Sequence, residues 1–159
     1  MAENMWLKID GCKGEANDDK HKDEIDVESY SWGMTHPVHS AGSGLSGGES
    51  TASPLVVTKF VDKASPNLMK FCMNAKVFSE VLLTCRKRGE NPIEYMKIKM
   101  KNALVAGVQD SGANDGAVAQ ESISFAFTAV EVEYTPQKPD GTADGAVTMK
   151  WDFAKNKEG

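Results

Sequence analysis

Apolar and polar residues alternate with a period of two through most of this chain, and this pattern confines it to folds built from half-buried strands. The first such run places Met5, Leu7 and Ile9 on one face before Gly11 ends it. Further runs predict strands at 25–34, 55–62, 80–88, 92–108, 122–134 and 147–153. We therefore expect a mainly β protein.

The run at 122–134 changes phase in its middle. Phe125 and its apolar neighbours lie on odd positions, whereas Val130 and those after it lie on even ones. An extra residue in one strand moves every later side chain to the other face of a sheet. The shift predicts a β-bulge near Thr128 or Ala129.

A single helix is expected after residue 62. Ser65 is a natural N-cap, and Pro66 suits the first helical position, where its missing N–H is not needed. Four residues then recur at i, i+3, i+4 and i+7, namely Leu68, Phe71, Cys72 and Ala75. We expect them to form one helix face that packs on a sheet.

Length and charge narrow the class of protein. The 159 residues suffice for one core, and no boundary or repeat is visible, so 1–159 is expected to be a single domain. The 23 acidic and 18 basic side chains leave a net charge of −5, whereas nucleic-acid-binding proteins usually carry a basic surface.

No apolar stretch approaches the roughly 20 residues of a membrane span, and the opening residues lack a signal-peptide core. We expect a cytoplasmic protein, or one that is exported without a cleaved signal peptide.

Few residues are candidates for catalysis or metal binding. His36 and His39 are three positions apart, and a metal site would need His21 or a nearby carboxylate as a further ligand. We interpret these histidines as solvated loop residues. The three cysteines have no CxxC spacing, and no GxSxG motif is present. The sequence therefore predicts no catalytic residue, no metal, no cofactor and no enzyme activity.

The segment 35–53 is rich in Gly and Pro and has no periodicity. Connections of this length in a compact domain are usually functional or disordered. Gly42 to Gly47 fits GxGxxG by letter, but a dinucleotide site would need this loop to join a strand directly to a helix. We interpret the segment as a long extended loop.

Two of the predicted strands carry distinctive polar faces. Ser29 and Ser31 form a small polar face opposite Tyr30 and Trp32. A basic stripe occupies alternate positions of a later strand, at Lys97, Lys99 and Lys101. The stripe could contact an acidic partner, but lysines also protect exposed strand edges from aggregation, and this second interpretation is favoured.

Six segments together resemble one family, the haemolysin-coregulated protein (Hcp) family, whose members build the tube of the bacterial type VI secretion system. The resemblance covers nearly the whole chain. The segments, in order, are Lys8-Ile9 with Lys13-Gly14-Glu15, Glu24-Ile25-Asp26-Val27, Tyr30-Ser31-Trp32-Gly33-Met34, Thr58 to Leu68, Arg86-Lys87 with Glu94-Tyr95, and Val130 to Gln137. A match to any one of these segments is weak evidence for the family, but six matches in the same order are specific for it.

The resemblance implies a compact antiparallel β-barrel of two sheets with one short α-helix packed on its side. It also implies homohexameric rings that stack into a tube, which a contractile sheath drives out of the cell with effector proteins in its lumen and a spike protein at its tip. Ser31 is implied to face the lumen as a cargo contact, and the alternation places Ser29 beside it. The long loop is implied to bridge subunits or rings through His36, Pro37, Val38, His39, Gly42, Gly44, Leu45 and Gly47.

Two other classes of function stay open at this point. One is a monomeric β-barrel binding module for a small ligand or protein partner, which predicts a monomer with an occupied pocket. The other is a hydrolase or metal enzyme built on His21, His36 and His39. The tube protein differs from both because it acts by assembly and not by catalysis.

Overall fold

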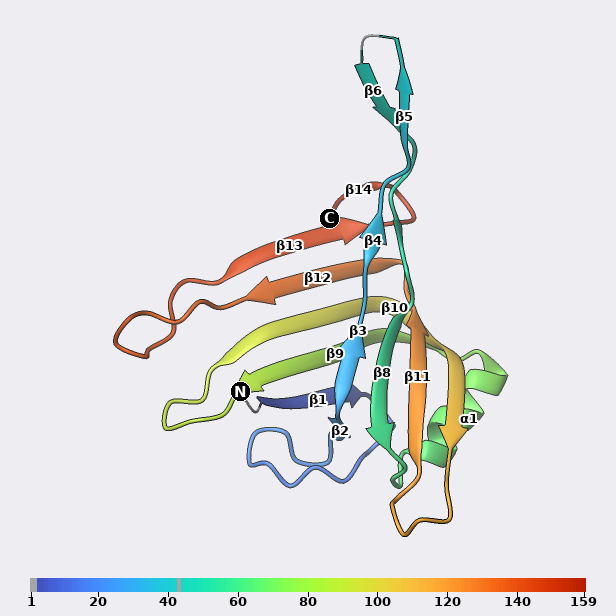
Figure 1. The fold of residues 1–159 in the computed structure, drawn as a ribbon, viewed down its shortest axis with the longest axis vertical. Coiled ribbons are helices and arrows are strands. Elements are labelled where there is room, and N and C mark those ends of the chain that lie inside the picture. Colours follow the sequence, from blue (N-terminus) through green and yellow to red (C-terminus); the bar gives the residue numbers. More distant parts are fainter. Residues whose placement is uncertain (1–2, 43) are drawn as a thin grey trace.

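The computed structural model describes residues 3–42 and 44–159. Within these residues the chain forms antiparallel strands and one helix, α1 (Ser65–Asn74), so the expected mainly β fold is confirmed. The main strands, labelled in Figure 1, are β1 (Glu3–Ile9), β2 (Ile25–Val27), β3 (Ser29–Ser31), β8 (Leu55–Phe60), β9 (Val77–Lys87), β10 (Glu94–Ser111), β11 (Gln120–Ala126), β12 (Ala129–Tyr134), β13 (Val147–Asp152) and β14 (Lys157–Glu158).

These ten strands share one antiparallel sheet. The first part of the long strand β10 pairs with β9 on one side and β12 on the other, and its second part pairs with β11. Pairing continues from β9 to β1 and β2, and from β11 to β8 and β3. Only Glu28 separates β2 from β3, so the sheet curls back towards its own start. The two layers expected from the sequence are two sides of this curled sheet, because β10 is long enough to belong to both.

The core lies inside the curl and consists of the inward positions of the alternating strands. The outward positions between them are polar or only partly buried. Side chains with no exposed surface include Leu7, Ile25, Leu55, Val57, Val81, Leu83, Met100, Ile123 and Phe125. Burial on one face of each strand explains why the alternation located most strands from the sequence.

The phase change in the run 122–134 coincides with a break in the strand at residues 127–128, between β11 and β12. The predicted bulge there is wrong, because the register across β10 is the same on both sides of the break. Opposite the break, the backbone of Asn102 lies in the left-handed region with a φ of +48°. The kink at Asn102 in β10 and the break between β11 and β12 lie opposite each other. Beyond them, the inward-facing positions change from odd to even numbers along the run 122–134.

Helix α1 packs against β10 and buries Leu68 and Phe71, two residues of the predicted face. Its N-cap is Ala64, and the expected cap at Ser65 is wrong. Ser65 is the first residue of the helix, and its hydroxyl oxygen accepts hydrogen bonds from outside the helix, from the Asp62 N–H at 3.0 Å and from Lys59 Nζ at 3.2 Å. The same hydroxyl donates to Glu121 Oε1 of β11 at 2.5 Å. In the described part of the chain no helix is long and apolar enough to cross a membrane.

The segment expected to be an extended loop contains four short strands. They are β4 (Met34–Thr35), which pairs with β7 (Thr51–Ala52), and β5 (Val38–Ala41), which pairs with β6 (Gly44–Gly47). Figure 1 shows the β5–β6 hairpin projecting far from the body of the molecule. Val38 and Leu45 are exposed on it. Because the hairpin side chains whose burial is described are all exposed, its strands need no apolar alternation, and the sequence pattern did not reveal them.

Candidate interaction surfaces

A surface of small hydroxyl side chains covers β3, β8 and β11, which run side by side in Figure 1. Ser29 lies opposite Thr58 across the β3–β8 pair, and Thr58 lies opposite Ser122 across the β8–β11 pair. Opposed residues of antiparallel strands point to the same side of the sheet. The next row on this side consists of Ser31, Val56 and Ser124. We call these two rows the hydroxyl face.

The hydroxyl face points away from the core. Val57 and Ile123, which alternate with its residues, have no exposed surface, whereas Ser29 and Ser31 are exposed. The serines therefore lie on a polar face, as their alternation with Tyr30 predicts. The two rows contain no charged side chain. Sequence reasoning missed the contributions of β8 and β11, although the alternation in both strands already separates their hydroxyl residues from their apolar ones.

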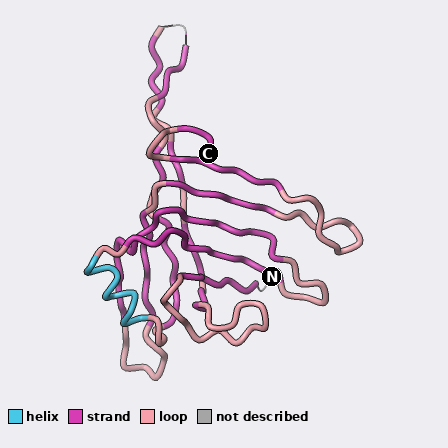
Figure 2. The backbone as a smooth tube through the Cα atoms, turned by 180° about the vertical axis from the view of Figure 1, so that it is seen from behind, coloured by secondary structure: helices cyan, strands magenta, loops and turns pink. Residues whose placement is uncertain are grey.

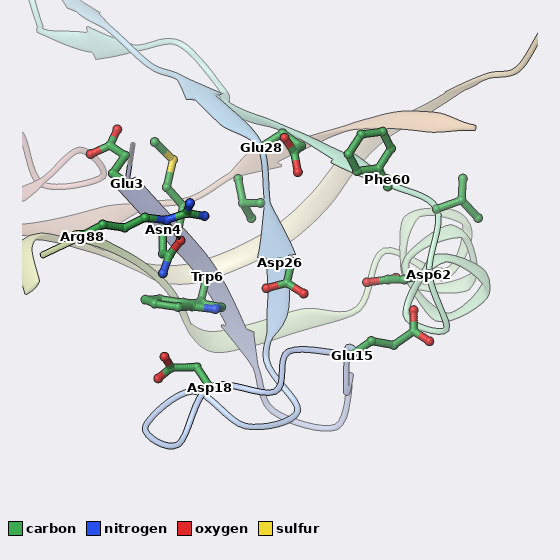
Figure 3. Close-up of a pocket in the computed structure, with 13 residues that line it drawn as sticks. Glu3, Asn4, Trp6, Glu15, Asp18, Asp26, Glu28, Phe60, Asp62 and Arg88 are labelled. Carbon is green, nitrogen blue, oxygen red and sulfur yellow. Dashed lines mark hydrogen bonds between the residues drawn. The ribbon is translucent and has the colours of Figure 1, made fainter. Parts of the chain in front are cut away.

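A pocket of about 540 Å³ lies between β1, β2 and the segment that joins β8 to α1. Figure 3 shows Asp26, Glu15 and Asp62 gathered on one side of this pocket and Arg88 on the other. Burial, followed by repulsion from Asp62, raises the pKa of Asp26 above its usual range. The Arg88 guanidinium donates to Asn4 Oδ1 at 2.7 Å. The pocket carries an excess of negative charge and so favours cationic over anionic groups.

A buried ion pair lies beneath the hydroxyl face. The Lys59 ammonium contacts Glu121 Oε1 directly and donates to Asp62 Oδ1 at 3.0 Å and Ser65 Oγ at 3.2 Å. The side chains of Lys59 and Glu121 have no exposed surface. Burial alone would raise the pKa of Glu121, but hydrogen bonds from Lys59 and Ser65 outweigh it and hold this pKa below its usual range. The pair connects β8, β11 and the start of α1. In the sequence, Lys59 stands at the next inward position after Leu55 and Val57, and a lysine at such a position was the signal of a buried charge.

The predicted ring-contact residues all lie on the hairpin or at its base, and all of them are exposed. Leu45 keeps 79% of its surface exposed near the tip. A Cβ at Gly47 would come within 2.0 Å of His36 Nε2, so this glycine leaves room for the His36 imidazole. The GxGxxG letters span the hairpin turn and β6, with Ser43 outside the described residues. Since β7 and β8 follow, the strand-to-helix context of a dinucleotide site is absent from the described chain here.

The three histidines are not brought together. His36 and His39 lie at the hairpin, but His21 is buried and keeps only 7% of its surface exposed. Its interpretation as a solvated loop residue is wrong, because the loop folds back onto the sheet. His21 Nδ1 lies 2.9 Å from Glu24 Oε2, its Nε2 lies 2.5 Å from Glu94 Oε1, and its ring stacks on Trp6. Among the described residues no group of three or more His, Cys, Asp or Glu side chains could hold a metal ion.

The lysine stripe lies on β10, which is paired on both sides, so the edge-protection interpretation is wrong. Lys99 lies opposite Glu131 of β12, which in turn lies opposite Lys150 of β13. Lys101 Nζ donates to Glu80 Oε1 at 2.7 Å. The stripe is therefore one row of a cross-strand charge ladder on the solvent side of the sheet.

Comparison with known proteins gave consistent matches. Residues 6–134 match the family model described as "Type VI secretion system effector, Hcp". The chain is 39% identical to "Protein hcp1" of Pseudomonas aeruginosa over 159 residues, which covers 98% of both proteins. A solved "Structure of a type six secretion system protein" has a TM-score of 0.95 at 32% identity and covers 99% of this chain and 100% of its own. The crystal structure of Hcp1 from Salmonella typhimurium has a TM-score of 0.80 at 37% identity, with 99% of both chains covered.

Proposed function

The chain belongs to the Hcp family of type VI secretion tube proteins, and from this premise we propose that six copies of it close into a ring. Rings would stack head to tail into a tube that carries effector proteins. The proposal treats residues 1–159 as a single domain, since one sheet contains both β1 and β14 together with eight of the strands between them. The likeness to Hcp structures over 99% of the chain supports it. The subunit would act by assembly and would bring no catalytic step of its own.

We propose that the hydroxyl face lines the lumen. The observation that carries this assignment is the set of small, uncharged side chains across three adjacent strands, five of which carry a hydroxyl and one of which is Val56. Such a surface offers hydrogen-bond donors and acceptors to many cargoes without a strong electrostatic preference. Ser29 and Ser31, both exposed on β3, would be the cargo contacts on this face.

The projecting hairpin would connect a subunit to its neighbours. Its exposed apolar residues, Val38 and Leu45, have no place in the core of their own chain and would bury surface in a neighbouring subunit or ring. The tube would further contact a spike protein and a contractile sheath. We expect the subunits to assemble in the cytoplasm and to leave the cell through the secretion apparatus, without cleavage of a signal peptide.

Light scattering and negative-stain images of the same purified fraction test the ring. Six protomer masses and rings with a central hole are expected. A monomer at micromolar concentration would contradict the proposal and favour a monomeric binding module.

Replacing Ser31 with arginine tests the lumen. The variant is expected to form rings of normal mass but to lower the effector level in cells. The long, positively charged arginine side chain would occupy the lumen where the cargo is proposed to bind. Thr148→Arg, on the charged side of β13, is the matched control and should leave effector levels unchanged. An unchanged effector level with Ser31→Arg would refute the cargo assignment.

A further inference from the structure

The sheet extends beyond the core as a two-strand wing, β12 and β13, with one apolar side. Tyr134 lies opposite Val147, and Val132 lies opposite Met149, so these four side chains share a side. We call them the wing face. They continue the row of Ile98 on β10, which is buried. Exposure rises outward to 41% at Met149 and 66% at Val147.

The other side of the wing is built for solvent. There Lys99, Glu131 and Lys150 form the charge ladder described above, and Thr148 alternates with the apolar residues of β13. Apolar alternation therefore continues along β13, although Val147 and Met149 stay exposed among the described residues of the subunit. The wing face also runs into a pocket of about 360 Å³ at the base of the hairpin. A contiguous exposed apolar surface of this kind marks an interface.

A second apolar surface lies at the other side of the subunit, on α1. Met69, Cys72 and Met73 line a pocket of about 260 Å³ together with Val108 of β10, and the Asp110 carboxylate lies at the same pocket. Met73 is 88% exposed. We call these four residues the helix patch. Both views, Figure 1 and Figure 2, place α1 and the free ends of β12 and β13 on opposite sides of the molecule.

We propose that the wing face of one copy docks on the helix patch of the next copy in the ring. This inference rests on the proposed ring and names the surfaces that close it. A cyclic ring repeats one heterologous contact, which requires two different patches on opposite sides of each subunit. The wing face and the helix patch meet both requirements. A second copy is the occupant because the two patches consist of apolar side chains and lie on opposite sides of the subunit, which is where a ring needs its two contacts with identical neighbours.

Two single substitutions test the pairing. Met149→Lys disables the wing face, and Met73→Lys disables the helix patch. Each is expected to reduce the mass in light scattering from six protomers to one. Thr148→Lys places the same charge on the solvent side of the same strand and should remain a hexamer.

Mixing the two disabled variants gives the decisive result. Each retains one intact patch, so one wing face and one helix patch can pair, whereas the two lysine-bearing patches repel each other. A dimer of one copy of each variant is expected, and misfolded variants could not form it. Hexamers of Met149→Lys or Met73→Lys, or a mixture that stays monomeric, would overturn the inference while the wild-type ring stands. A wild-type monomer would instead overturn the proposed ring itself.

Discussion

Replacing Lys59 with methionine is expected to destabilise the fold by about 3–5 kcal/mol, the usual cost of removing one partner from a buried ion pair. Methionine keeps the volume of the side chain but leaves the Glu121 carboxylate in the core with the Ser65 hydroxyl as its remaining donor among the hydrogen bonds found. For a domain of this size, the loss corresponds to a decrease in melting temperature of roughly 6–20 °C.

Glu121→Leu should cost less than Lys59→Met. The Lys59 ammonium would keep Asp62 Oδ1 at 3.0 Å as a counter-charge, and the Asp62 side chain is partly exposed. The double variant should recover most of the stability, because a buried ion pair replaced by apolar groups of similar volume is often neutral or stabilising. Denaturant unfolding of the four proteins, at one protomer concentration so that assembly contributes equally, gives the coupling energy directly.

The pH dependence supplies an independent check. The folded-state pKa of Glu121 is lowered, so its stabilising contribution is complete above the ordinary pKa of a glutamate and is lost as the pH falls through the lower folded-state value. The deficit of Lys59→Met relative to wild type should therefore be largest at neutral pH and shrink in acid, where the stranded carboxylate takes up a proton. A deficit below about 1 kcal/mol, or a double variant as unstable as the sum of the singles, would refute the reasoning.

Three further predictions follow from packing and burial. His21→Ala should cost roughly 2–4 kcal/mol in chemical unfolding, because the Glu24 and Glu94 carboxylates lose their shared hydrogen-bond partner and the stacking ring leaves a gap beside Trp6; an unchanged midpoint would contradict the buried bridge. Gly14→Ala should cost about 1–3 kcal/mol, since its Cβ would meet backbone atoms at 2.5 Å and 2.7 Å, whereas Gly145→Ala, with nothing within 4 Å, should be near neutral. Burial raises the pKa of Cys12 to about 11 and of Cys85 to about 12, so a disulfide reagent at pH 8 should label at most one thiol per folded chain, and rapid labelling of two would count against this burial.

Local pattern predicted the strands well where one face is buried. The alternation of Leu55, Val57 and Lys59 matches β8, and that of Ile123 and Phe125 matches β11. The hairpin at 38–47 escaped prediction for the same reason, because an arm without a buried face has no apolar period.

Errors arose where a residue's partner lies far along the chain. Ser65 resembles an N-cap in the local sequence, but its hydroxyl bonds to Lys59 and to Glu121, which lies 56 positions further along the chain. His21 reads as a loop residue among charges, but Glu94, 73 positions away, buries and holds it. Lys99 reads as edge protection, but both edges of β10 are covered. In each case the local sequence was compatible with the prediction, and the structure differs because a residue or strand far along the chain contacts the residue concerned.

Residue order alone was enough to place the strands that have one buried face, the helix and the polar side of Ser29 and Ser31, because strand and helix periods are local and repeat within a few residues. It could not show that serines from three strands form one hydroxyl face, or that Lys59 meets Glu121 beneath it. Those facts depend on the register between strands that lie about 60 positions apart in this chain. Register is set by the packing of the whole sheet, and a shift of one residue would turn the hydroxyls into the core.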